Sequence, residues 1–148
     1  VSSTRIREAL ESADFVAAES LLGRPYSISG RVIYGRQLGR SLGTPTANLE
    51  LRRLRAPLSG VYAVEVSGAH LERAPGVANV GVRPTVDDSI KANLEVHLLD
   101  REIELYGQHI EVTFRHKLRD EKKFESVDEL KDNIARDIER ARDWFHMA

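Results

Sequence analysis

The feature that most restricts the fold is the spacing of apolar residues between Tyr26 and Leu118. Apolar and polar residues alternate there with a period near two, and glycine or proline interrupts the alternation at short intervals, which is typical of short β-strands joined by turns. We expect six strands, at Ser27–Tyr34, Ala47–Leu51, Gly60–Ser67, Gly76–Val82, Asn93–Leu99 and Ile110–Leu118. Because parallel pairing needs connections of about a dozen residues or more, the sheet is predicted to be antiparallel, and closure into a barrel would remove its exposed edges.

Helical patterns flank this strand region on both sides. We expect two short helices within Ser3–Leu22, with Asp14 as an N-cap and Gly23 as a left-handed end. Near the C-terminus, Ser126 and Glu129 have the spacing of a capping box. The apolar stripe that follows predicts a long helix packed on the barrel, with these residues facing it: Val127, Leu130, Ile134, Ile138, Ala141 and Phe145.

Composition excludes several classes of function. The 148 residues suit one domain, and the lack of cysteine rules out disulfides, thiolate catalysis and cysteine-based zinc sites. It also favours a cytoplasmic location. No apolar run approaches the roughly 20 residues of a membrane helix, so no membrane partner is expected. The net charge of −1 and the aromatic content of 6% oppose a general nucleic-acid binder. The five histidines lack metal-site spacing and are expected at the surface.

The segment 35–48, GRQLGRSLGTPTAN, has a composition that folding alone does not explain. Its glycines recur at every fourth position around an arginine, so backbone N–H groups could approach phosphate oxygens closely. Thr46 and Asn48 are two residues apart, so on an extended segment both oxygen-bearing side chains point to one side, where their oxygens suit Mg²⁺ shared with a polyphosphate. The spacing is not that of the Gly-x-x-x-x-Gly-Lys loop. A glycine-rich hairpin with a Thr-Asn turn explains the segment equally well.

Glu95 is the candidate for acid–base chemistry. Leu94, Val96 and Leu98 alternate with Asn93, Glu95 and His97, so an apolar core on one side would leave Glu95 projecting from the other side of a rigid strand. A carboxylate held there could accept the proton of an attacking hydroxyl. It could equally be an ordinary polar residue on the wet face of a strand.

Short motifs lie along nearly the whole chain, namely GRV at 30–32, GTPTAN at 43–48, GVYAV at 60–64, NVGVRPT at 79–85, EVHLLD at 95–100, YG at 106–107 and LRDEKKF at 118–124. Together they resemble the riboflavin kinase module, in particular the C-terminal half of the bacterial bifunctional riboflavin kinase/FAD synthetase family. The resemblance implies a mainly β fold, a six-stranded antiparallel Greek-key barrel with a C-terminal α-helix and a short helical N-terminal segment.

The same resemblance implies a reaction and a set of site residues. ATP would phosphorylate the 5′-hydroxyl of riboflavin, giving FMN and ADP in the presence of Mg²⁺. Glu95 would be the catalytic base, and Thr46 and Asn48 would be the metal ligands. The residues implied to contact ATP are Gly35, Gly39, Arg40, Gly43, Pro45, Thr46, Asn48 and Tyr62. Those implied to contact the flavin are Arg119, Asn79 and Thr85, with Arg119 in a flap over the ring.

The N-terminal residues VSSTRIR are similar to the motif that closes the adenylyltransferase module in that family. We therefore expect residues 1–25 to be a helical linker from an absent N-terminal adenylyltransferase module, and residues 26–148 to be the kinase barrel with its helix. FAD synthetase activity is not expected from this chain. A non-catalytic flavin-binding or regulatory barrel is the alternative function, although it would give Thr46, Asn48 and Glu95 no role.

Overall fold

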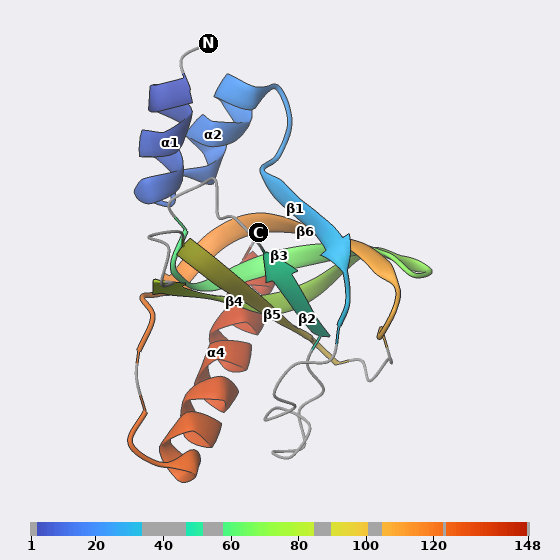
Figure 1. Ribbon diagram of the computed structural model, residues 1–148, viewed down its shortest axis with the longest axis vertical. Helices are drawn as coiled ribbons and strands as arrows, with labels where there is room; N and C mark the ends of the chain where they lie inside the picture. Colours follow the sequence, from blue (N-terminus) through green and yellow to red (C-terminus); the bar gives the residue numbers. More distant parts are fainter. Residues whose placement is uncertain are drawn as a thin grey trace.

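The computed structural model describes residues 3–33, 47–51, 58–84, 90–100, 105–122 and 124–147. Its elements, in chain order, are α1 (Ser3–Glu11), α2 (Phe15–Leu22), β1 (Ser27–Arg31), β2 (Ala47–Leu51), β3 (Gly60–Gly68), β4 (Leu71–Pro84), β5 (Ile90–Leu98), β6 (His109–Arg119) and α4 (Val127–Met147). The expected mainly β fold, with short helices before the strands and a long helix after them, is confirmed (Figure 1).

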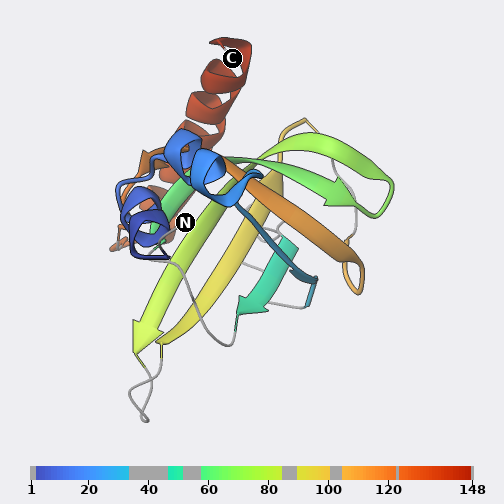
Figure 2. The ribbon, with the colours of Figure 1, turned by 90° about the horizontal axis from the view of Figure 1, so that it is seen from above.

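The six strands form one antiparallel sheet in the order β1-β6-β3-β4-β5-β2. Strands β3, β4 and β5 follow one another as neighbours, and β6 returns to lie beside β3, which is the Greek-key arrangement. The sheet curls until its two edges approach, and the Ile33 N–H donates to the Asn48 carbonyl at 2.8 Å across the gap. The barrel is therefore nearly closed, as seen from above in Figure 2.

The largest difference from the expected strand bounds is in β4, which begins five residues before the expected Gly76. The hairpin between β3 and β4 turns at Ala69 and His70, which have φ of 50° and 70°. Left-handed residues at both turn positions suit the right-handed twist of a hairpin, but glycine or asparagine usually supplies them. Since neither residue is a turn signal, the sequence did not indicate that the strands continue to so tight a turn.

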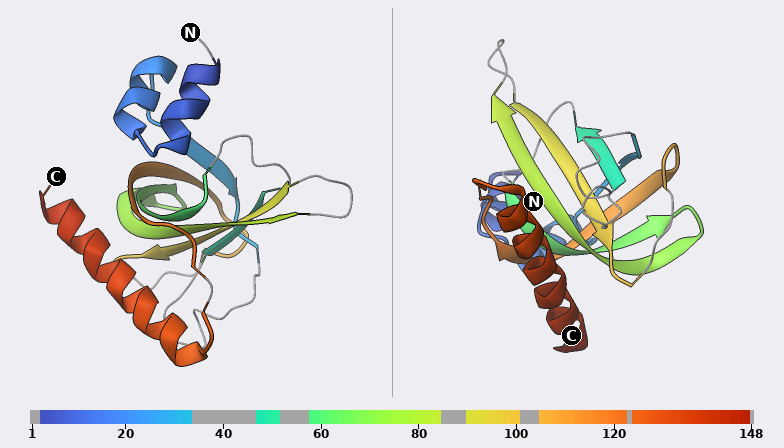
Figure 3. Two further views of the ribbon diagram at one scale, coloured as in Figure 1. Left: turned by 90° about the vertical axis from the view of Figure 1, so that its left-hand side faces the viewer. Right: turned by 90° about the horizontal axis from the view of Figure 1, so that it is seen from below.

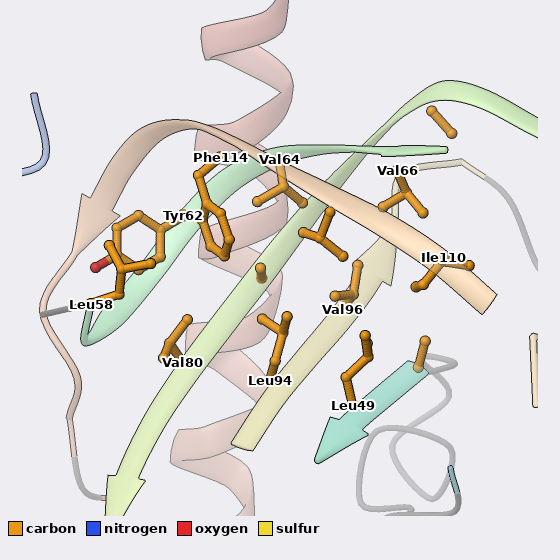
Figure 4. Packing of buried hydrophobic residues seen from close by; sticks show 14 of the residues in the cluster. Leu49, Leu58, Tyr62, Val64, Val66, Val80, Leu94, Val96, Ile110 and Phe114 are labelled. Carbon is orange, nitrogen blue, oxygen red and sulfur yellow. The ribbon is translucent and has the colours of Figure 1, made fainter. Parts of the chain in front are cut away.

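The interior of the barrel is apolar. Leu94 on β5 pairs with Leu49 on β2 and with Val80 on β4, and all three are at most 1% exposed. Figure 4 shows these side chains in one cluster with Phe114 and Tyr62. Fully burying a side chain of this size contributes about 1.5–3 kcal/mol to folding, so this cluster is the main source of stability.

Helices α1 and α2 cover one end of the barrel (Figure 3). Phe15 of α2 inserts toward the barrel aromatics, its ring centroid 5.8 Å from that of Tyr62 and 6.1 Å from that of Phe114. The predicted ends of α2 are confirmed, since Asp14 Oδ1 accepts a hydrogen bond from the Ala17 N–H at 3.0 Å and Gly23 has φ of 78°. The two helices thus share the barrel's hydrophobic core.

Helix α4 packs against the outer face of the sheet. Ala141, Ile138 and Phe145 contact a second apolar cluster that includes Val61 and Val77. The start of α4 has the predicted Ser126 cap, whose Oγ accepts from the Glu129 N–H at 3.1 Å, whereas the Glu129 carboxylate accepts from the N–H of Glu125 and not of Ser126.

No helix in the described ranges is long and apolar enough to cross a membrane.

Candidate active site

Strand pairing brings polar residues from four strands into one row. Asn48 on β2 pairs with Glu95 on β5, and Glu95 pairs with Asn79 on β4. Asn79 in turn pairs with Val61 on β3, and Val61 with Arg119 on β6. Because residues directly opposite each other in a sheet project on the same side, all five side chains lie on one face.

This face is the outer one, which α4 partly covers. Three members of the row are adjacent in sequence to a residue of the barrel interior: Asn48 to Leu49, Glu95 to Leu94, and Asn79 to Val80. The alternation of the strands therefore directs Glu95 away from the core, as the sequence predicted.

A pocket lies between this face and α4. The sheet contributes Glu95, Asn79 and Arg119 together with apolar residues such as Val61, and α4 contributes Leu130 and Ile134. It has a volume of about 620 Å³, including open solvent at its mouth. A pocket whose walls are mostly apolar, with a few polar side chains among them, is typical of small-molecule sites.

Asn79 carries a buried acceptor that faces no donor. Its Oδ1 is inaccessible to solvent and has no hydrogen-bond partner among the described residues. An unpaired buried acceptor costs about 1–3 kcal/mol, so such a group calls for an explanation. Asn79 also lines the pocket, so a turn of its side chain would present the amide to an N–H or O–H group of a ligand there.

Arg119 and Phe124 form the side of the pocket nearest the end of β6. The Arg119 guanidinium lies 5.7 Å from the centre of the Phe124 ring. Its Nη1 donates to the Asp120 carbonyl at 3.0 Å. The Asp120 side chain points to Lys117 instead, and the hydrogen bond from that ammonium lowers the pKa of the Asp120 carboxyl.

Two residues in or near the pocket were not singled out from the sequence. Asp137 is 4% exposed and makes an ion pair with Arg119 from the apolar side of α4. Its position, three residues after Ile134 and four before Ala141, follows the spacing of the apolar stripe and is the signal that could have identified it. His97 was expected at the surface, but it is 7% exposed and lines the pocket. It shares the face of Glu95, two residues away on β5.

Tyr62 lies elsewhere. It is 1% exposed in the barrel core, and its hydroxyl accepts from the Ser59 N–H at 3.0 Å and donates to the Ser59 carbonyl at 3.2 Å. Burial raises the pKa of this phenol. A contact between Tyr62 and ATP stays a prediction, and the inward orientation of the side chain does not support it.

The structure brings together four predicted site residues, namely Asn48, Glu95, Asn79 and Arg119. Asn48 is 4% exposed beside Glu95. The other predicted positions lie outside the described residues: Gly35, Gly39, Arg40, Gly43, Pro45, Thr46 and Thr85.

Comparison with known proteins gives a consistent result. The family model for riboflavin kinase matches residues 22–145. The bifunctional riboflavin kinase/FMN adenylyltransferase of Escherichia coli K12 is 55% identical over 145 residues, which are 98% of this chain and 46% of that protein. The protein of the same name from Pseudomonas fluorescens is 54% identical over 96% of this chain and 45% of its own length. The chain therefore spans less than half the length of these relatives.

Solved structures extend the comparison to the fold. A crystal structure described as a macrolide-efflux protein from Streptococcus pneumoniae superposes with a TM-score of 0.84 at 39% identity, over 97% of this chain and 47% of that one. Riboflavin kinase from Trypanosoma brucei superposes with a TM-score of 0.60 over 82% of this chain and 78% of that one, but at 20% identity it shows the fold alone.

Proposed function

This chain belongs to the riboflavin kinase family, and on that premise we propose that it transfers the γ-phosphate of ATP to the 5′-hydroxyl of riboflavin, giving FMN and ADP. The observation that carries the proposal is the row of Asn48, Glu95 and Asn79, of which Glu95 and Asn79 line a mostly apolar pocket. It provides a possible base, a possible phosphate or metal contact and a place for a flavin ring within three neighbouring strands.

Glu95 is proposed as the base. It stands between two amides on a strand with paired neighbours on both sides, so its backbone is held firmly. A carboxylate within hydrogen-bond reach of the ribityl 5′-hydroxyl would orient that hydroxyl and accept its proton. Phosphoryl transfer depends mostly on positioning and on neutralising charge, so few protein groups are sufficient.

Riboflavin kinases use ATP and typically a divalent metal, which we propose is Mg²⁺ here. The donor set fits, because the Asn48 amide offers the kind of hard oxygen atom that Mg²⁺ prefers, and the neighbouring Glu95 carboxylate adds negative charge beside it. Thr46 and Asn48 would hold the ion, and ATP phosphates would supply further oxygens. The ion would neutralise charge on the phosphates.

The pocket under α4 is the proposed place for the isoalloxazine ring. Phe124, Leu130 and Ile134 offer apolar surface to a flat aromatic ligand, and Asn79 Oδ1 offers an acceptor to a flavin N–H or to a ribityl hydroxyl. Covering by α4 would keep water from the reacting groups. The predicted nucleotide contacts in the glycine segment, and the flavin contact of Thr85, complete the proposal as expectations.

We also propose that this chain acts as the kinase alone, in the cytoplasm. Its relatives are named for a second activity, FMN adenylyltransfer, and this chain corresponds to less than half of their length. FAD should therefore not form from FMN and ATP with this chain. Detectable FAD would contradict this part of the proposal. An N-terminal adenylyltransferase module is the proposed neighbour in the longer protein.

The test is formation of FMN. The chain is incubated with riboflavin and Mg·ATP, and FMN is followed by chromatography, with Glu95→Ala as the matched control. We expect FMN to form with the wild type and to fall to a small fraction with the variant. Binding of riboflavin without FMN would instead indicate the non-catalytic flavin-binding barrel.

A division of roles can be tested in the same assay. Asn48→Ala should raise the KM for Mg·ATP, because it removes a proposed ligand, whereas Glu95→Ala should lower kcat and leave that KM nearly unchanged. Equal effects of the two variants on both constants would contradict the assignment.

A further inference from the structure

A buried ion pair connects the end of β6 to the middle of α4. Arg119 Nε donates to Asp137 Oδ1 at 2.8 Å, and Arg119 Nη2 donates to Asp137 Oδ2 at 2.8 Å. The two side chains are 17% and 6% exposed. Both carboxylate oxygens are engaged, so the planar guanidinium is held in a single orientation.

The chain reaches this geometry through an irregularity in β6. Tyr62 pairs with Lys117, but the preceding residue, Val61, pairs with Arg119, so Leu118 is an extra residue in the ladder. In a regular strand Arg119 would project on the same side as Lys117, toward Tyr62. The extra residue instead places Arg119 beside Val61, on the side where Leu118 contacts the cluster under α4. Such bulges often redirect a side chain next to a functional site.

Stability alone does not account for the pair. Replacing a buried ion pair with apolar residues is often neutral or stabilising, because taking both charges out of water offsets their attraction. The surrounding positions of α4 are apolar, among them Ile134, Ile138 and Ala141. A leucine at 137 would continue this stripe, so the carboxylate is better explained by its effect on the Arg119 guanidinium that it binds.

Through Arg119, the Asp137 carboxylate holds one side of the pocket in place. Arg119 lies over Phe124 and donates to the Asp120 carbonyl, so fixing the guanidinium also restrains Asp120 and Phe124, and Phe124 lines the pocket. Asn79 is on the other side of Val61 in the same row. The spacing between the acceptor at Asn79 and the aromatic side at Phe124 thus depends on where Arg119 points.

We propose that Asp137 is a positioning residue for the flavin, which acts by fixing Arg119, and through it Phe124, against the pocket. The proposal rests on the proposed function. A positioning role differs from a purely structural one because it affects the binding of one substrate. Loss of the carboxylate should weaken the binding of riboflavin and leave the binding of Mg·ATP almost unchanged.

The test compares Asp137→Asn with Asp100→Asn in the 148-residue chain. Asp100 accepts from Arg142 at 2.6 Å and also ties α4 to the barrel, but it does not line the pocket. We expect Asp137→Asn to raise the riboflavin KM about tenfold or more, with the ATP KM changed less than about threefold, and Asp100→Asn to change neither. An unchanged riboflavin KM, or an equal rise in both constants, would overturn the proposal.

A second pair of variants, made in the Arg119→Met chain, separates an effect on the position of Arg119 from an effect on folding. In Arg119→Met there is no guanidinium to orient, so adding Asp137→Leu should not weaken the binding of riboflavin further. The doubly substituted chain should remain folded, because both charges are gone. If the losses of riboflavin affinity caused by the two substitutions were additive, the result would contradict the proposal.

Direct binding of riboflavin, measured by quenching of its fluorescence, distinguishes failure of the kinase assignment from failure of the positioning role. If the wild type binds riboflavin more tightly than Asp137→Asn but forms no FMN, the positioning role stands and the kinase assignment fails. If the wild type forms FMN and the variant binds equally well, only the positioning role fails. No binding by the wild type overturns both.

Discussion

The inner and outer faces of the barrel are made by alternate residues of the same strands, so the neighbours Leu94 and Glu95 belong to different regions of the molecule. The inner face is apolar throughout its cluster and is closed at one end by α2. The outer face carries a polar row and, under α4, a buried acceptor at Asn79 for which the described part of the chain supplies no donor. The inner face contributes stability, and the outer face keeps groups that cost stability and suit ligand binding.

The largest effect is expected where α2 meets the barrel. Phe15→Ala should lower the free energy of unfolding by about 3–5 kcal/mol, because it removes a ring that contacts both Tyr62 and Phe114 and leaves a cavity. Urea denaturation measures the change. The adjacent Val16 is 81% exposed, so Val16→Ala is the control and should change it by less than about 0.5 kcal/mol. A small effect of Phe15→Ala would mean that α1 and α2 are only a linker beside the core.

The comparison is sharpest at two adjacent residues of β5. Leu94→Ala should cost about 2–5 kcal/mol of stability, since Leu94 is 0% exposed in the interior. Glu95→Gln, one position along, should cost less than about 1 kcal/mol, because it keeps the size of the side chain on the outer face. Equal losses of stability in urea denaturation would remove the distinction between the two faces.

Alkaline pH gives the smallest effect and probes the inner face again. Burial raises the pKa of Tyr26, which contacts Phe114 with ring centroids 5.9 Å apart. A raised pKa means that the neutral phenol is favoured in the folded state, so its contribution is complete below about pH 10 and is lost as the pH rises through the folded pKa. The decline in stability above about pH 10 should be shallower for Tyr26→Phe. An identical decline would contradict the burial of this phenol.

Much of the fold followed from local patterns. The period-two alternation located all six strands, and the caps at Asp14 and Ser126 located the starts of two helices, because these signals depend on residues close in sequence. The outward direction of Glu95 followed for the same reason. The full length of β4 did not, because Ala69 and His70 carry no turn signal.

The arrangement of the site depended on contacts that sequence spacing does not express. That Asn48, Glu95 and Asn79 form one row is a consequence of the pairing register of three strands. Asp137 has the spacing of the apolar stripe, but its ion pair with Arg119 depends on how α4 packs against the end of β6. Tyr62 was placed at the nucleotide by resemblance, whereas strand alternation puts its side chain inside.

The central claim is that the outer face performs the chemistry through Glu95, and single-turnover kinetics tests it most directly. With Mg·ATP and riboflavin both saturating, the rate of FMN formation by Glu95→Gln should fall about 10²–10⁴-fold relative to the wild type. Riboflavin affinity and stability in urea should remain close to those of the wild type. A rate within about threefold of the wild type would contradict the assignment of Glu95 as the base.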